Sequence, residues 1–147
     1  MPEILMSHVT LCVTDLERST RFYVDTFGFD APYRRAAGDD FAPLLGLPTL
    51  DLELVMLHLG EQRLELVCHR AAPHPRTEAP MNTVGFTHIA FYVPDIDEAC
   101  ARVEAYGGTV DAAHRIKTTV HGEQREYAFV RDPDGNRVEL IKGSVLG

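Results

Sequence analysis

The chain has 147 residues, the usual size of one domain, and its hydrophobic fraction of 45% and charged fraction of 24% are those of an ordinary globular protein. Its net charge of −8 argues against nucleic acid or an anionic membrane as a partner, because both require a cationic surface. No stretch approaches the ~20 apolar residues of a membrane span, and three cysteines without close spacing fit reduced thiols, so a cytoplasmic protein is expected.

The first predicted elements are a strand and a helix. Residues 8–13 alternate between apolar and polar side chains, which indicates a strand half buried in a sheet, with His8 opposite the apolar face. Asp15 is placed to cap a helix with apolar residues at helical spacing up to Phe27. Gly28 then ends that helix.

The next segment is predicted to complete a first half of the fold. A short strand is expected at 31–35, followed by an irregular loop at 36–49 with a helical turn at 42–45. Residues 50–59 and 63–69 read as a hairpin, in which Glu65 lies on the face opposite its leucine neighbours. Residues 70–86, with three prolines and no periodicity, are predicted to form a linker.

The second half restarts the same pattern. A strand at 87–93 leads to a helix capped by Asp95 and ended by the glycines at 107–108. Short strands are expected around 109–110, 117–120 and 126–130. Residues 132–135, with the sequence D-P-D-G, predict a turn before the last strand at 137–142.

The two halves are an internal repeat. A shift of 80 residues places His8 on His88, and a shift of 74 places Glu65 on Glu139, so the first half holds six extra residues, expected in the loop at 38–49. The fold predicted is α+β, a single domain over residues 1–147 made of two βαβββ modules at about 7–69 and 87–142. Each module begins with a histidine and ends with a glutamate.

The matched histidines and glutamates predict a metal site. Imidazole and carboxylate suit Zn, Ni, Co, Mn or Fe, and four protein ligands leave positions for water or substrate oxygens. A single such residue is usually a polar strand position, so the hypothesis depends on the duplication. His69, on the predicted Glu65 face, is a candidate partner of a ligand, and the histidines without a counterpart are expected at the surface: His58, His74, His114 and His121.

The repeated strand histidine followed by V/T-x-D-L/I, together with the terminal D-P-D-G-N-R-V-E-L, resembles the vicinal oxygen chelate superfamily. This superfamily includes glyoxalase I, epimerases, extradiol dioxygenases and resistance proteins. The resemblance covers residues 7–142 and implies a U-shaped, partly open mixed sheet around one divalent metal. It places His8, Glu65, His88 and Glu139 at the metal-ligand positions.

This ligand set resembles that of the isomerase branch. The resemblance implies a metal-dependent epimerase or isomerase that moves a proton next to a metal-bound carbonyl through an enediolate, acting on an acyl thioester or a sugar-like ketone. Glu139 is the preferred base and Glu65 its partner. The expected assembly is a homodimer that binds a small-molecule substrate, with the site built within one chain or across two.

Three alternatives stay open. The first is glyoxalase I (lactoylglutathione lyase), although the residues from Glu65, E-L-V-C-H-R, depart from the E-L-T-x-N-x-G run usual there. The second is a metal-dependent extradiol-type dioxygenase, and the third is a non-catalytic protein that binds a small molecule.

Overall fold

The computed structural model describes residues 3–71 and 73–145, and the chain divides into two compact units, Met1–Pro75 and Arg76–Gly147. The boundary falls inside the segment predicted as a linker, of which residue 72 lies outside the described residues.

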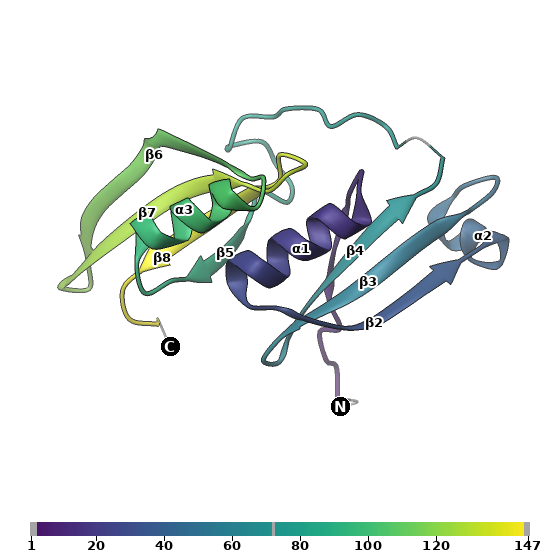
Figure 1. Cartoon of the computed structure of the whole chain (residues 1–147), viewed down its shortest axis with the longest axis horizontal. Helices are drawn as coiled ribbons and strands as arrows, with labels where there is room; N and C mark the ends of the chain where they lie inside the picture. The colour runs from purple at the N-terminus through teal and green to yellow at the C-terminus, as the bar shows by residue number, and fades with distance from the viewer. Residues whose placement is uncertain (1–2, 72, 146–147) are drawn as a thin grey trace. The chain divides into compact units, whose positions relative to one another are not determined.

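The first unit contains one four-stranded sheet and one long helix (Figure 1). Its elements, in chain order, are β1 (Val9–Cys12), α1 (Leu16–Phe27), β2 (Asp30–Ala37), a 3-10 turn (Asp39–Phe41), α2 (Ala42–Leu45), β3 (Leu52–Leu59) and β4 (Gln62–His69). The strand order is β1-β4-β3-β2, with β1 parallel to β4 and the other pairs antiparallel. The sheet is therefore mixed.

The helix α1 begins and ends as its sequence predicts. The Asp15 carboxylate accepts a hydrogen bond from the backbone N–H of Arg18 at 3.0 Å, and Gly28 ends the helix with a φ of +79°. Its apolar side packs on β3 and β4, where Phe22, Tyr23, Leu57 and Leu66 are fully buried. Burying side chains of this size stabilises the unit by roughly 1.5–3 kcal/mol each.

The opposite face of this sheet is partly covered at one end. The connection between β2 and β3 folds back so that Ala42 and Leu50 pack with Leu52 and Leu54 of β3. In the second unit the corresponding strands are joined only by His121 and Gly122. The extra residues of the first half therefore lie where the sequence predicts them.

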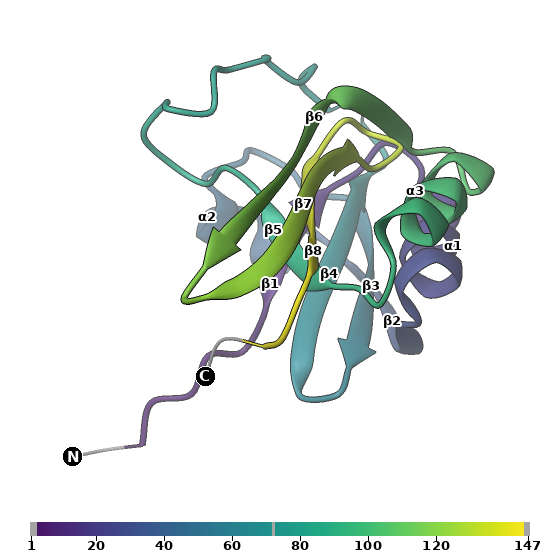
Figure 2. The same cartoon turned by 90° about the vertical axis from the view of Figure 1, so that its left-hand side faces the viewer.

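The second unit repeats the arrangement (Figure 2). Its elements are β5 (Ile89–Tyr92), α3 (Ile96–Ala105), β6 (Thr109–Val120), β7 (Glu123–Arg131) and β8 (Arg137–Lys142), with strand order β5-β8-β7-β6. β5 is parallel to β8 and the other pairs are antiparallel. Its core is formed by side chains of α3, β7 and β8: Ile96, Val103, Val130, Val138 and Leu140.

The prediction of two separate strands after the second helix is wrong. The two short strands expected at 109–110 and 117–120 belong to the single strand β6, whose register against β7 shifts between Val110 and Arg115. The strand pattern is lost across this irregularity because inserted residues break the alternation of faces. The alternation of apolar and polar residues is therefore interrupted in the sequence, although the strand itself is continuous.

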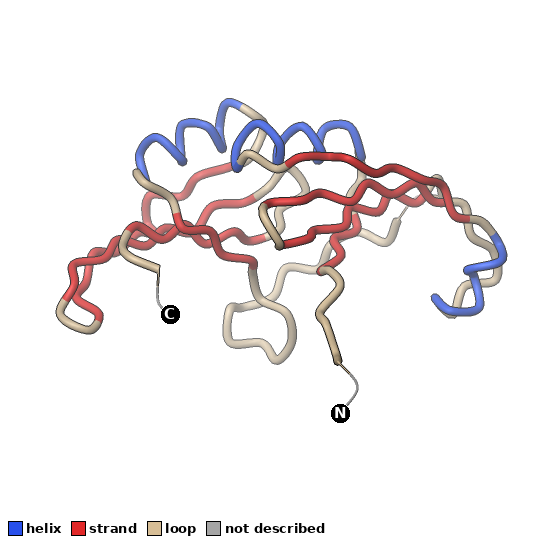
Figure 3. The backbone as a smooth tube through the Cα atoms, turned by 90° about the horizontal axis from the view of Figure 1, so that it is seen from below, coloured by secondary structure: helices blue, strands red, loops and turns tan. Residues whose placement is uncertain are grey.

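Both units have the βαβββ order with open, mixed sheets, which confirms the predicted modules. Figure 3 shows that the helix of each unit lies against one face of its own sheet. Among the described residues, no helix is both long and apolar enough to cross a membrane.

Candidate metal centre

The first predicted ligand pair lies on the face of its sheet opposite α1. His8 directly precedes β1, and Thr10, two residues later, lies opposite Glu65 of β4. Since alternate residues of a strand share a face, His8 and Glu65 project from the same side. Their side chains meet, with His8 Nε2 3.3 Å from Glu65 Oε2.

The second unit reproduces this pair. His88 precedes β5, and Ala90 lies opposite Glu139 of β8. His88 Nε2 lies 3.4 Å from Glu139 Oε2, and the neighbours of Glu139 on β8, Val138 and Leu140, are fully buried beneath α3. The shifts of 80 and 74 residues in the sequence therefore correspond to equivalent positions in the two sheets.

A hydroxyl group contacts the other ring nitrogen of each histidine. Ser7 Oγ lies 2.9 Å from His8 Nδ1, and Thr87 Oγ1 lies 2.8 Å from His88 Nδ1. A proton on Nδ1 that is donated to the hydroxyl oxygen leaves the Nε2 lone pair directed at the glutamate. The repeat itself carried this signal, because a hydroxyl residue precedes the histidine in both copies, but sequence reasoning missed it.

The geometry of each pair fits two ligands of one metal. Nitrogen and oxygen ligands about 2.1 Å from a metal, at angles of 90–110°, lie about 2.9–3.4 Å from each other. Separations of 3.3 and 3.4 Å fall in this range and exceed the ~2.8 Å usual for a charge-assisted hydrogen bond. The donor set of imidazole nitrogen and carboxylate oxygen fits a divalent transition metal.

The ligand pairs are only partly exposed. Among the residues that the structure describes, no group of three or more His, Cys, Asp or Glu side chains forms, so each pair is found within its own unit. The side chains are 32% exposed at His8, 15% at Glu65, 29% at His88 and 21% at Glu139. Such partial exposure leaves each pair reachable by a small molecule. His69 lies at the end of β4, opposite Leu52, and its role stays a prediction.

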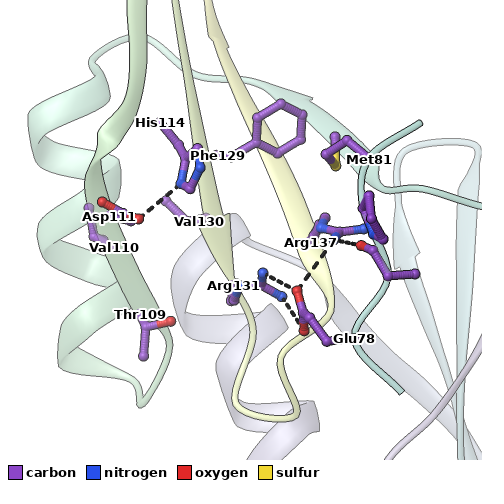
Figure 4. A pocket seen from close by; sticks show the side chains of 12 residues that line it. Glu78, Met81, Thr109, Val110, Asp111, His114, Phe129, Val130, Arg131 and Arg137 are labelled. Atoms are coloured by element: carbon purple, nitrogen blue, oxygen red, sulfur yellow. Dashed lines mark hydrogen bonds and ion pairs between the residues drawn. The ribbon is translucent and has the colours of Figure 1, made fainter. Parts of the chain in front are cut away.

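Next to the second pair the structure contains a pocket that sequence reasoning missed. The pocket has a volume of about 750 Å³ and lies over β6, β7 and β8 and the segment at 78–81 (Figure 4). Phe129, in its wall, lies opposite Glu139 in the sheet, and its ring stacks edge-on against the His88 ring at 5.0 Å. The pocket therefore adjoins the pair of His88 and Glu139.

Charged side chains line one end of this pocket. Glu78 forms ion pairs with Arg131 and Arg137, and its pKa is held below the usual range by the hydrogen bond from Arg131 and by the charges of Arg131 and Arg137. His114, expected only as a surface histidine, also lines the pocket and lies 3.0 Å from Asp111.

Known proteins are similar to this chain in sequence and in fold. The sequence model of one protein family, the Glyoxalase/Bleomycin resistance protein/Dioxygenase superfamily, matches residues 5–140. The lactoylglutathione lyase of Pseudomonas putida is 28% identical over 98% of this chain and 88% of its own length. A probable lactoylglutathione lyase of Vibrio parahaemolyticus is 30% identical over 92% of this chain and 88% of its own length.

A solved structure supports the fold. The crystal structure of a glyoxalase family protein from Bacillus cereus has a TM-score of 0.79 and 22% identity, covering 96% of each chain. The predicted family resemblance is thereby confirmed, and the relatives named as lyases support the expectation of an enzyme. The relatives named as lyases agree better with the glyoxalase I alternative than with the epimerase reading.

Proposed function

Since the chain belongs to the Glyoxalase/Bleomycin resistance protein/Dioxygenase superfamily, we propose that it is a divalent-metal-dependent isomerase of the glyoxalase I type. Its substrate would be the hemithioacetal of a 2-oxoaldehyde and a thiol, and its product the thioester of a 2-hydroxy acid. The observation that carries the proposal is the equivalent His–Glu pair in each unit, at 3.3 and 3.4 Å. The names of the two curated relatives support the choice of reaction.

The chain's own residues supply the metal ligands in this proposal. His8 and Glu65 provide one half of the set, and His88 and Glu139 the other. A bound Zn, Ni, Co, Mn or Fe ion would act as a Lewis acid toward the two neighbouring oxygen atoms of the substrate. Ser7 and Thr87 would hold the imidazoles in the orientation that presents Nε2.

The two carboxylates divide the proton transfer. Glu139 removes the proton from the carbon that carries sulfur and hydroxyl, and the electron pair left behind forms the double bond of an enediolate. Glu65 gives a proton to the neighbouring carbon, and the hydroxyl proton of the first carbon moves to the oxygen of the second, so one carbon is oxidised and the other reduced with no external electron acceptor. The proton taken up by Glu139 then replaces the one that Glu65 has given. The apolar wall at Phe129 limits the access of water to Glu139 during this exchange.

A metal-dependent epimerase is the second candidate function. It is favoured by one observation, the run that begins at Glu65, E-L-V-C-H-R, which has valine and histidine where the usual E-L-T-x-N-x-G run has threonine and asparagine. An epimerase would use the same carboxylates on opposite faces of a single carbon. Its substrate would be an acyl thioester or a sugar-like ketone.

We further propose a cytoplasmic homodimer, in which each complete ligand set combines one pair from each kind of unit. Three cysteines without close spacing in the sequence suit a reducing compartment. Mixing the inactive variants His8→Ala and His88→Ala tests how the units combine. Sites built across two chains recover part of the activity in the mixed dimer, whereas sites built within one chain recover none.

The function is tested with the hemithioacetal of 2-oxopropanal and glutathione, in the presence of Zn, Ni, Co or Mn. We expect thioester formation, followed by ultraviolet absorbance, and its loss in Glu139→Gln. Glu61→Gln, a change of an exposed glutamate in the β3–β4 turn, is the matched control and should keep activity. Absence of thioester with every metal, together with solvent deuterium exchange into an acyl thioester or ketone, would favour the epimerase.

A further inference from the structure

The pocket beside His88 and Glu139 ends in a pair of arginines that share one carboxylate. Arg131 Nη2 lies 2.6 Å and Arg137 Nη2 3.3 Å from the same oxygen of Glu78, Oε1 (Figure 4). Arg131 also donates to the backbone oxygen of Gly135 at 2.9 Å, and Arg137 donates to that of Ala79. The two guanidinium groups are therefore fixed by the backbone as well as by Glu78.

The arginines and their carboxylate differ in exposure. The side chain of Arg137 is 13% exposed and that of Arg131 35%, whereas that of Glu78 is 62% exposed. Glu78 lies on a segment without regular secondary structure, while both arginines stand on strands. The carboxylate is thus the group that can leave, and its departure would uncover two partly buried positive charges.

The arginines are well placed with respect to the proposed base. Arg137 and Glu139 are alternate residues of β8, so they share a face and their backbones are about 7 Å apart. Arg131 lies directly opposite Arg137 in the sheet, as Phe129 lies opposite Glu139. A small molecule whose reacting carbons lie at Glu139 could therefore place a charged end at the arginines.

We propose that Arg131 and Arg137 form a binding site for a carboxylate of the substrate, and that Glu78 occupies this site until the substrate displaces it. The proposal rests on the proposed function, because it assigns the substrate class of the same site. Arg131 contacts both oxygens of Glu78, which is the bidentate arrangement that arginine uses to bind carboxylates. The site therefore selects substrates with an anion a few bonds from the reacting carbons.

The kinetic test compares two hemithioacetals of 2-oxopropanal that differ only in charge, made with 3-mercaptopropionate and with its amide. We expect kcat/KM to be about tenfold higher for the carboxylate than for the amide, because the arginines form a pair of charge-assisted hydrogen bonds with the carboxylate alone. The double variant Arg131→Gln, Arg137→Gln should abolish this preference, and Glu78→Gln should lower KM for the carboxylate substrate only. As controls, Arg70→Gln and Glu53→Gln break an arginine–glutamate pair in the first unit. They should change neither the preference for the carboxylate substrate nor its KM.

The proposal would be overturned if the double arginine variant kept the preference for the carboxylate over the amide substrate. It would also be overturned if this preference were the same in Glu78→Gln and in the native chain. Absence of turnover for both substrates would instead contradict the proposed function. The binding site is then tested alone, with succinate as probe and succinamide as its neutral control, by NMR of the arginine Nε–H groups. We expect succinate to bind more tightly to Glu78→Gln than to the native chain; equal binding, or binding without the arginines, would overturn the proposal.

Discussion

Phe129 of β7 lies opposite Glu139 of β8, and its ring contacts that of His88 at 5.0 Å, so one aromatic side chain borders both members of the second His–Glu pair. At the equivalent place in the first unit, Met56 lies opposite Glu65. The two His–Glu pairs are thus equivalent in their side chains and differ in the side chain that flanks them.

This difference predicts a modest role for the aromatic ring in metal affinity. Phe129→Met gives the second unit the flanking residue of the first, so the imidazole loses an edge-on contact of roughly 0.5–1.5 kcal/mol. We expect metal affinity, measured by competition with a chelator, to fall by less than about tenfold, with the fold retained. Met56→Leu, at the equivalent position, is the control. A loss of all metal in Phe129→Met would show that the ring does more than orient the imidazole.

The two histidines are expected to be equally necessary. His8→Ala and His88→Ala each remove one nitrogen ligand, so each should lose metal and activity together. His58→Ala changes a histidine outside the two pairs, so this variant should keep its metal and its activity. The check is metal content by mass spectrometry beside turnover. An alanine variant of either histidine that kept its full metal content would remove that residue from the ligand set.

The helix cap of α3 predicts a pH effect. Asp95 accepts hydrogen bonds from the backbone N–H groups of Asp97 and Glu98 and from Lys142 at 2.8 Å, and the bond from Lys142 is the largest cause that lowers the pKa of Asp95 to about 2. Because this pKa is below the unfolded value near 4, the pair stabilises the fold above pH ~4 and the contribution is lost as the pH falls toward 2.

Lys142→Met should therefore raise the pKa of Asp95 toward its usual value. The measurement is an NMR titration of the Asp95 carboxyl carbon, with the unfolding midpoint followed between pH 2 and pH 5. Lys117→Met, which removes an exposed lysine of β6, is the control and should leave the titration of Asp95 in place. If the titration of Asp95 had the same midpoint in Lys142→Met and in the native chain, Lys142 would not be the cause of the lowered pKa.

The glycine after β8 should tolerate substitution poorly. Gly143 has a φ of +152°, and a Cβ there would lie 2.9 Å from Cγ of the buried Arg125. Gly28 also has a positive φ, +79°, but open space around the position of a Cβ. Both alanine variants should cost about 1 kcal/mol for backbone strain, and Gly143→Ala should cost more because Arg125 must move. Equal unfolding free energies for the two would argue against a steric conflict at Gly143.

Much of this architecture could be predicted from the sequence because the repeat is carried by residues with local roles. Asp15 and Asp95 cap helices, Gly28 ends one, and the turn at 132–135 forms as its D-P-D-G sequence dictates. The pairs of His8 with Glu65 and of His88 with Glu139 followed from matching positions in the two halves. Duplication turned residues distant in sequence into predictable neighbours.

The pocket could not be predicted in the same way. Glu78 lies in a segment without periodicity, and its contact with Arg131 joins residues far apart in the chain that have no counterpart in the first half. The irregularity in β6, which places His114 at the pocket, breaks the alternation on which strand prediction depends. One usable signal was present, since Arg137 stands two residues before Glu139 and so shares its face.

The proposed reaction requires that two His–Glu pairs hold one metal at which carboxylates move a proton. The most direct test is the transition-metal content of the protein purified without chelator and then offered Zn, Ni, Co and Mn in turn. We expect about one equivalent of metal per chain, since each chain supplies one pair of each kind. Less than about a tenth of an equivalent with every metal would contradict it.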